Sequence, residues 1–129
     1  MRRRACLILA SVLLSTGAAI ARVPDSGISG RIVDGPVCPV QSVPPRPGCA
    51  PRPLRATLHI RRARSQALYA SVRSSADGRF RVRLPPGTYV VGALAYGGSP
   101  LPRPPAPRRV QVHPGRYTHI TITYDTGIR

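Results

Sequence analysis

The segment Asp77–Val91 constrains the fold more than any other part of the chain, because it contains two short strands joined by a sharp corner. It opens on the pair Asp77-Gly78, which tolerates the positive φ that tight turns require. From Phe80 to Leu84, apolar residues alternate with arginines, the period of two that a half-buried strand shows. Pro85-Pro86-Gly87 interrupts that strand, and a second alternating run begins at Tyr89. The segment therefore predicts β-structure with one apolar and one polar face.

The same alternation recurs along the chain and predicts seven strands, at 27–33, 54–62, 66–74, 79–84, 89–93, 110–112 and 118–124. Prolines crowd the segments 34–53 and 97–107, which are predicted to be loops because proline cannot donate to a sheet ladder. No helical periodicity appears after residue 21. We therefore expect one all-β domain over 27–129, a seven-stranded antiparallel Greek-key-like β-sandwich.

The phase of the alternation also predicts which side chains face the core. Leu68, Ala70 and Val72 share one phase and should point inward. By the same argument, Tyr89 and Tyr124 are predicted to be buried. Tyr69 and Tyr117 are out of phase with the apolar residues around them, so they are predicted to face solvent.

The first 21 residues are predicted to be a secretory signal peptide. Arginines occupy positions 2–4, residues 5–20 are almost wholly apolar or small, and Ala19-Ile20-Ala21 fits a small-x-small cleavage site. Cleavage between Ala21 and Arg22 would leave a short tail, 22–26, before the domain. The location expected is secreted, periplasmic or at the cell envelope. Retention of the segment as an uncleaved anchor is the alternative; no other stretch is apolar for long enough to span a membrane.

Two cysteines, Cys38 and Cys49, remain after the predicted cleavage, and both lie in the Pro-rich segment 34–53. Thiols placed in this way in an exported chain are predicted to form a disulfide. A metal site is the alternative, but the three histidines are scattered and none forms a pair near the cysteines.

The charge of the chain is strongly one-sided. Twenty arginines face four aspartates, with no lysine and no glutamate, so the net charge is +16, and it is +13 without Arg2, Arg3 and Arg4. A charge of this size attracts anions over long distances. The partners expected are an anionic envelope polymer or an envelope protein, while export disfavours nucleic acid. The alternative is a solvated cationic surface without a specific partner.

One motif resembles a known family. Asp77, Gly78, Phe80, Val82, Leu84, Pro86, Gly87 and Tyr89, with the opening strand Gly27–Val33, resemble the carboxypeptidase regulatory-like domains of secreted bacterial proteins. These domains belong to the transthyretin-like (prealbumin-like) sandwiches, and the resemblance implies a non-catalytic accessory, adhesion or envelope module. The chain has neither lysine nor asparagine, so the isopeptide bond of the related adhesin repeats cannot form. Its end, from Tyr124 to Arg129, lacks the Tyr-Arg-Gly-Ser signature of transthyretin-like hydrolases.

The candidate site is a row of outward arginines. Arg79, Arg81 and Arg83 alternate with apolar residues on one predicted strand, and Arg61 and Arg73 are expected near them. Guanidinium groups bind phosphates and carboxylates in bidentate fashion, so the row is a candidate anion-binding face. The competing interpretation is an ordinary solvated strand face whose charge prevents edge-to-edge aggregation.

Two other functional classes compete with anion binding. A carbohydrate-binding module is the alternative function, although no tryptophan, one phenylalanine and five tyrosines make a thin sugar platform. An enzyme is not expected, because no nucleophile–base pair or metal cluster is evident in the sequence. No cofactor is predicted.

Overall fold

The structure, a computed structural model, describes residue 17 and residues 25–129. The predicted signal peptide with its Ala21–Arg22 cleavage site lies outside the described residues, apart from residue 17, and so does most of the tail 22–26. No helix within the described part is long and apolar enough to cross a membrane.

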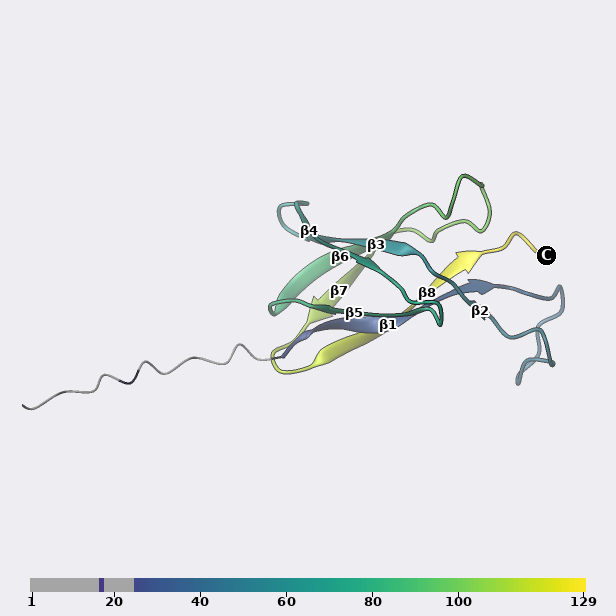
Figure 1. Cartoon of the computed structure of the whole chain (residues 1–129), viewed down its shortest axis with the longest axis horizontal. Coiled ribbons are helices and arrows are strands. Elements are labelled where there is room, and N and C mark those ends of the chain that lie inside the picture. Colours follow the sequence, from purple (N-terminus) through teal and green to yellow (C-terminus); the bar gives the residue numbers. More distant parts are fainter. Residues whose placement is uncertain (1–16, 18–24) are drawn as a thin grey trace, which may run out of the picture.

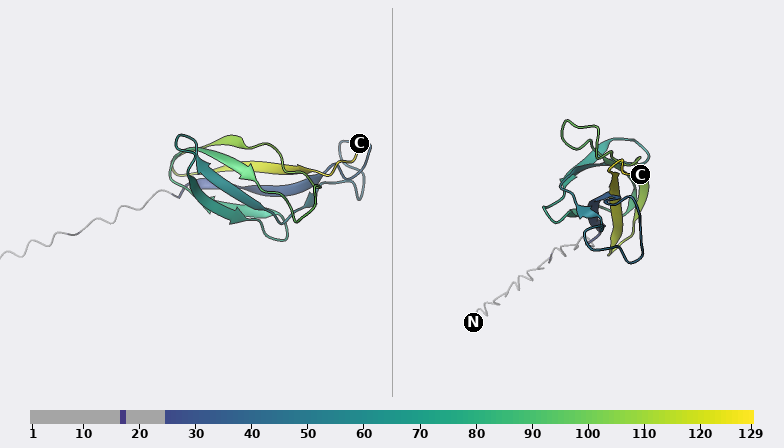
Figure 2. Two further views of the ribbon diagram at one scale, coloured as in Figure 1. Left: turned by 90° about the horizontal axis from the view of Figure 1, so that it is seen from above. Right: turned by 90° about the vertical axis from the view of Figure 1, so that its right-hand side faces the viewer.

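Two four-stranded sheets make up the domain and pack face to face (Figures 1 and 2). In the first sheet, β1 lies between β8 on one side and β5 and β2 on the other; the second has the order β4-β3-β6-β7. The strands are β1 (Gly27–Gly35), β2 (Arg52–Pro53), β3 (Thr57–Arg62), β4 (Leu68–Arg73), β5 (Arg79–Arg83), β6 (Gly87–Ala93), β7 (Arg108–Val112) and β8 (Tyr117–Asp125). The expected all-β sandwich is confirmed at this level.

The expectation of antiparallel pairing throughout is wrong for one strand pair. β1 and β8 run parallel, in register from Gly27 opposite Tyr117 to Gly35 opposite Asp125. The direction of a pairing depends on how the chain connects the two strands, which the alternation of side chains does not record.

The strand count also differs from the expectation. An eighth strand, β2, pairs Arg52 and Pro53 with Asp34 and Val33 of β1, inside the segment predicted to be a loop. Proline is tolerated there because β2 lies at the edge of its sheet.

The core fills the space between the sheets with buried residues from six of the strands, and the partly buried Ala70 and Val72 of β4 pack against it. Ile28, Ile32, Leu58 and Ile60 have no solvent-exposed surface. The expected burial of the two tyrosines is confirmed, since Tyr89 and Tyr124 are 2% and 0% exposed. Each hydroxyl reaches a backbone carbonyl: Tyr89 donates to Pro85 at 2.6 Å and Tyr124 to Leu94 at 2.5 Å.

A β-bulge in β4 overturns one of the predicted orientations. The register shifts between Ile60 and Arg61, which pair with Ala70 and Leu68, so that Tyr69 becomes the extra residue. Leu68, predicted to be inward, is 50% exposed. Tyr69 is 40% exposed, as predicted, although its ring also packs edge-on against the buried Tyr89 at 5.9 Å between ring centroids. An inserted residue moves the neighbouring side chains to the opposite face, because the period of a strand is two.

The loops gather at the two ends of the sandwich (Figure 1). One end carries the C-terminus, the 94–107 segment and the loop closed by the Cys38–Cys49 disulfide, with Cα atoms 5.3 Å apart. The opposite end carries the turns that follow β3, β5 and β7. The two ends therefore offer separate surfaces to any partner.

Candidate anion-binding surfaces

The predicted arginine row lies on the outer face of the first sheet. Phe80 takes the inner face of β5, and Arg79, Arg81 and Arg83 are therefore exposed on the outer one. β5 pairs with β1, which sets Arg79 opposite Arg31 and adds a fourth arginine that sequence reasoning missed.

Arg61 and Arg73 do not join this row. They belong to β3 and β4, which are strands of the second sheet. The turn at 75–78, with Gly78 at φ 77° as its Asp-Gly pair predicted, carries the chain from one sheet to the other. β4 and β5 are consecutive in sequence yet are not hydrogen-bonded neighbours, so the predicted set divides between the two sheets.

Asp25 and Tyr117 contact Arg83 and Arg81 and so fix the end of the arginine row. The Tyr117 hydroxyl donates to Asp25 at 2.7 Å, Arg83 Nε donates to the same carboxylate at 3.2 Å, and Arg81 lies 3.8 Å over the Tyr117 ring. Gly27 makes room for this cluster, because a Cβ there would lie 2.0 Å from the carbonyl oxygen of Val82 and 2.9 Å from the Tyr117 ring. The parallel pairing of β8 with β1, which the sequence does not reveal, is what brings Tyr117 to this position.

The cluster reduces the capacity of the row to hold an outside anion. The hydrogen bond from Tyr117, together with Arg83 and Arg81, holds the pKa of Asp25 below its ordinary value, so the carboxylate stays charged. Arg81 and Arg83 both form ion pairs with Asp25, at 3.4 and 3.2 Å. Arg79 pairs with Asp77 at 3.4 Å. An open depression of about 550 Å³ crosses this face, but its arginines are largely compensated from within the chain.

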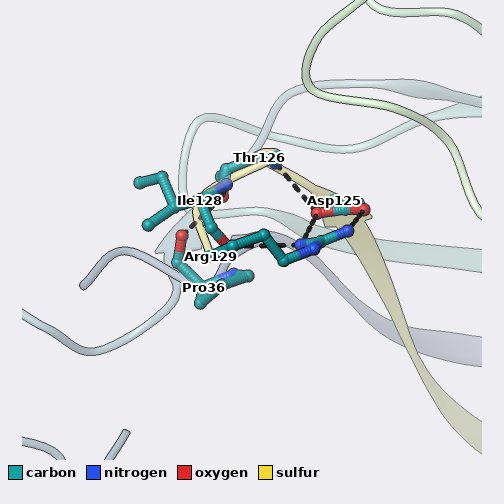
Figure 3. Close-up of polar contacts among 6 residues, drawn as sticks. Pro36, Asp125, Thr126, Ile128 and Arg129 are labelled. Carbon is teal, nitrogen blue, oxygen red and sulfur yellow. Dashed lines mark hydrogen bonds and ion pairs between the residues drawn. The ribbon is translucent and has the colours of Figure 1, made fainter. Parts of the chain in front are cut away.

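The other two aspartates are also paired. Asp34 binds Arg52 at 3.2 Å across the β1–β2 rung. Asp125 binds Arg129 at 2.9 Å, and the amide of Gly127 donates to the same carboxylate at 2.9 Å (Figure 3). These donors lower the pKa of Asp125 to about 2, with the Arg129 hydrogen bond as the largest cause. The nearby hydroxyl of Thr126 donates to Pro36 O at 2.5 Å, so the C-terminal turn is fixed against the start of the disulfide loop.

The chain therefore has more cations than its own acids can pair with. All four aspartates lie in the described part, and together they pair with five of the sixteen arginines there. The eleven arginines of residues 25–129 without a carboxylate partner are Arg31, Arg46, Arg55, Arg61, Arg62, Arg64, Arg73, Arg103, Arg108, Arg109 and Arg116. Any anion that the domain binds must be held mainly by members of this set.

The exposed tyrosines do not form a common platform. Tyr69 belongs to the second sheet and Tyr117 to the first, and each ring is covered on one face by an arginine, Arg62 at 4.5 Å and Arg81 at 3.8 Å. Tyr96, 40% exposed, lies in the 94–107 segment. Within the described residues, no group of three or more His, Cys, Asp or Glu side chains is arranged to hold a metal.

Comparison with known proteins identifies the fold. The sequence matches no family model and no curated protein. Among solved structures, the chain is similar to the crystal structure of a minor pilin of Streptococcus agalactiae, with a TM-score of 0.53 and 13% sequence identity. The similarity covers 81% of this chain and 46% of the pilin chain, so the protein spans less than half of that neighbour. At this identity, the likeness extends to the fold alone.

Proposed function

We propose that this protein is a non-enzymatic exported β-sandwich module that engages anionic polymers at the cell envelope or outside the cell. The observation that carries the proposal is the charge distribution. Every aspartate is paired with an arginine, yet eleven arginines of the described part have no carboxylate partner. A surface of this kind draws polyanions over long distances and can bind them through several guanidinium groups at once.

Three further observations support an exported, structural role. The Cys38–Cys49 disulfide is typical of proteins that fold in oxidising compartments. The signal-like residues 1–21 point to the same route. The structural neighbour is itself a minor pilin. The motif from Asp77 to Tyr89 further suggests that the domain is of the carboxypeptidase regulatory-like type.

Retention of the full chain on a polyphosphate-coupled and a polyglutamate-coupled resin tests the proposal, with an uncharged resin of the same matrix as the control. We expect retention on at least one anionic resin at 20 mM salt and elution by about 0.5 M salt, since surface charges farther apart than a few Å are screened there. Flow-through on both anionic resins at 20 mM salt would contradict the proposal. Salt-insensitive capture by a neutral glycan array would favour the carbohydrate-binding alternative instead.

A further inference from the structure

A hollow of about 630 Å³ lies at the end of the sandwich that is remote from the disulfide loop and the C-terminus. The turn after β3 forms one wall and the start of β6 another. Its lining residues are Arg62, Ala63, Arg64, Ser65, Pro86, Gly87, Thr88, Tyr89 and Arg109. Three arginines and the hydroxyls of Ser65 and Thr88 thus line one concave surface, and no acidic side chain is among its lining residues.

Arg62 is positioned by an aromatic stack. It ends β3 opposite the buried Tyr89, and its guanidinium lies 4.5 Å from the centroid of the Tyr69 ring. The bulge in β4 turns Tyr69 toward this position, where its ring also contacts Tyr89. A cation–π contact attracts the guanidinium to the ring without adding a negative charge, so Arg62 is positioned without being neutralised.

The turn that carries Arg64 and Ser65 is held by several hydrogen bonds. The amide of Arg62 donates to Ala67 O at 3.0 Å, and the amide of Gln66 donates back to Arg62 O at 2.9 Å. The amide of Ala63 donates to Thr88 O at 3.1 Å, which joins the turn to β6. This side of the hollow is therefore built into the fold rather than formed by a free loop.

Arg109 completes the hollow from the neighbouring strand. It lies on β7 opposite Val90 of β6, and it is exposed because Val110 takes the inner face. Two hydrogen-bonded strand ladders, β3–β6 and β6–β7, thus fix the backbone positions of Arg62 and Arg109.

The charge of this site is unbalanced, unlike that of the β5 row. Arg62, Arg64 and Arg109 belong to the eleven arginines without a carboxylate partner, whereas the β5 row is compensated by Asp25 and Asp77. Three like charges around one hollow repel one another, and a bound anion removes this repulsion. We propose that this hollow binds phosphate groups of a phosphate-bearing polymer, through Arg62, Arg64 and Arg109.

The donor set selects phosphate over carboxylate. Each guanidinium offers up to five N–H donors, and the hydroxyls of Ser65 and Thr88 add two more. A carboxylate has two acceptor oxygens that lie in one plane. An internal phosphate of a polymer has two non-bridging oxygens arranged tetrahedrally and a terminal phosphate has three, so consecutive linked phosphates present acceptors in several directions to the donors around the hollow. The hollow, at about 630 Å³, is larger than a single phosphate and suits two or more linked groups. This inference rests on the proposed function, because it names the ligand class and the site.

Matched double variants of the full chain test the site. Arg64→Gln/Arg109→Gln removes two charges from the hollow, and Arg46→Gln/Arg55→Gln removes two unpaired, exposed charges elsewhere. Binding of a polyphosphate chain at 50 mM salt is measured by calorimetry. We expect the hollow variant to lose about tenfold in affinity for each arginine, as charge-assisted hydrogen bonds are lost. The affinity of the control variant should fall by less than about threefold, because only the general electrostatic attraction between protein and polyphosphate weakens.

A conservative variant and two further probes sharpen the test. Arg62→Lys keeps the charge but loses the planar donor set, so we expect its affinity for polyphosphate to fall by about threefold to tenfold. Its circular dichroism spectrum should be unchanged. Inorganic phosphate is expected to bind at least tenfold more weakly than the polymer, and polyglutamate more weakly than polyphosphate.

The outcomes separate this proposal from the proposed function. Equal losses in the two double variants would overturn the assignment of the hollow, while general polyanion binding by the protein would stand. Equal or tighter binding of polyglutamate would overturn the phosphate class. Inorganic phosphate binding as tightly as the chain would overturn the polymer as its source. Absence of binding to either polyanion by the unmodified protein would overturn the proposed function as well.

Discussion

Replacing both disulfide cysteines, Cys38 and Cys49, by serine is expected to lower the free energy of unfolding by about 3 kcal/mol. The crosslink joins positions separated by 11 in the sequence. Closing a loop of this size removes conformational entropy from the unfolded chain worth about 3 kcal/mol at 25 °C. The effect should act almost entirely on the unfolded state, because the native loop has few contacts to lose.

The structure supports the expectation that the disulfide acts on the unfolded state and not on the native state. The rung between Asp34 and Arg52 lies outside the disulfide ring and holds the two ends of the loop together independently. Inside the ring, Val40 and Val43 are 62% and 101% exposed, so little apolar packing depends on the loop. The native sandwich should therefore survive removal of the disulfide with its sheets unchanged.

Urea unfolding followed by circular dichroism measures the effect, with Cys6→Ser in both proteins so that no third thiol exchanges. With a slope of roughly 1–3 kcal/mol/M, the midpoint should fall by about 1–3 M urea, and the slope should rise slightly as the unfolded chain expands. An unchanged midpoint would refute the chain-entropy argument. A loss well above about 5 kcal/mol would show instead that the loop packs on the core, against its observed exposure.

Three further perturbations have defined outcomes. Ser74→Ala should lower the free energy of urea unfolding by about 1–3 kcal/mol. The buried Ser74 hydroxyl accepts from the amide of Ala56 (2.9 Å) and donates to the carbonyl of Leu54 (2.7 Å), and both groups would lose this partner. A loss below about 0.5 kcal/mol would contradict this reasoning. Asp25→Asn should move elution from a polyphosphate resin to higher salt, because it frees Arg81 for outside anions; elution at unchanged salt would show that the row does not bind. The pKa of Asp125 is lowered from 3.8 to about 2, so its stabilising contribution is present above about pH 4 and is lost as the pH falls toward 2. Carboxyl NMR titration should show this pKa rising toward 3.8 in Arg129→Gln, and an equal value in both proteins would exclude the ion pair as its cause.

The sequence alone specified seven of the eight strands, apart from their exact ends, and most of the faces that they bury. Alternation placed Phe80 and Leu84 in the core and the arginines of β5 outside it. It also predicted the burial of Tyr89 and Tyr124. The pairing of Cys38 with Cys49 could be predicted because the third cysteine, Cys6, lies in the segment predicted to be a signal peptide. These inferences succeeded because they depend on local periodicity and composition, which each segment carries by itself.

The candidate site was predicted less well. Arg79, Arg81 and Arg83 do share one outer face, but Arg61 and Arg73 lie on the other sheet. The outward arginines of β5 could be predicted from alternation, whereas the compensation of Arg81 and Arg83 by Asp25 could not. Ion pairs such as the one between Asp25 and Arg83 join residues that are far apart in sequence, and no local pattern predicts them.

Only the tertiary structure decided which strands become neighbours. The parallel pairing of β1 with β8 brought Tyr117 beside the arginine row, and the bulge at Tyr69 set Arg62 over an aromatic ring at the edge of the hollow. The alternation along a strand predicts which side chains turn inward. It is the same whether the neighbouring strand is parallel or antiparallel, and it does not reveal an inserted residue. Direction, register and partner are settled only when the two sheets pack, since the hydrogen-bond ladders and the shared core must then be satisfied together.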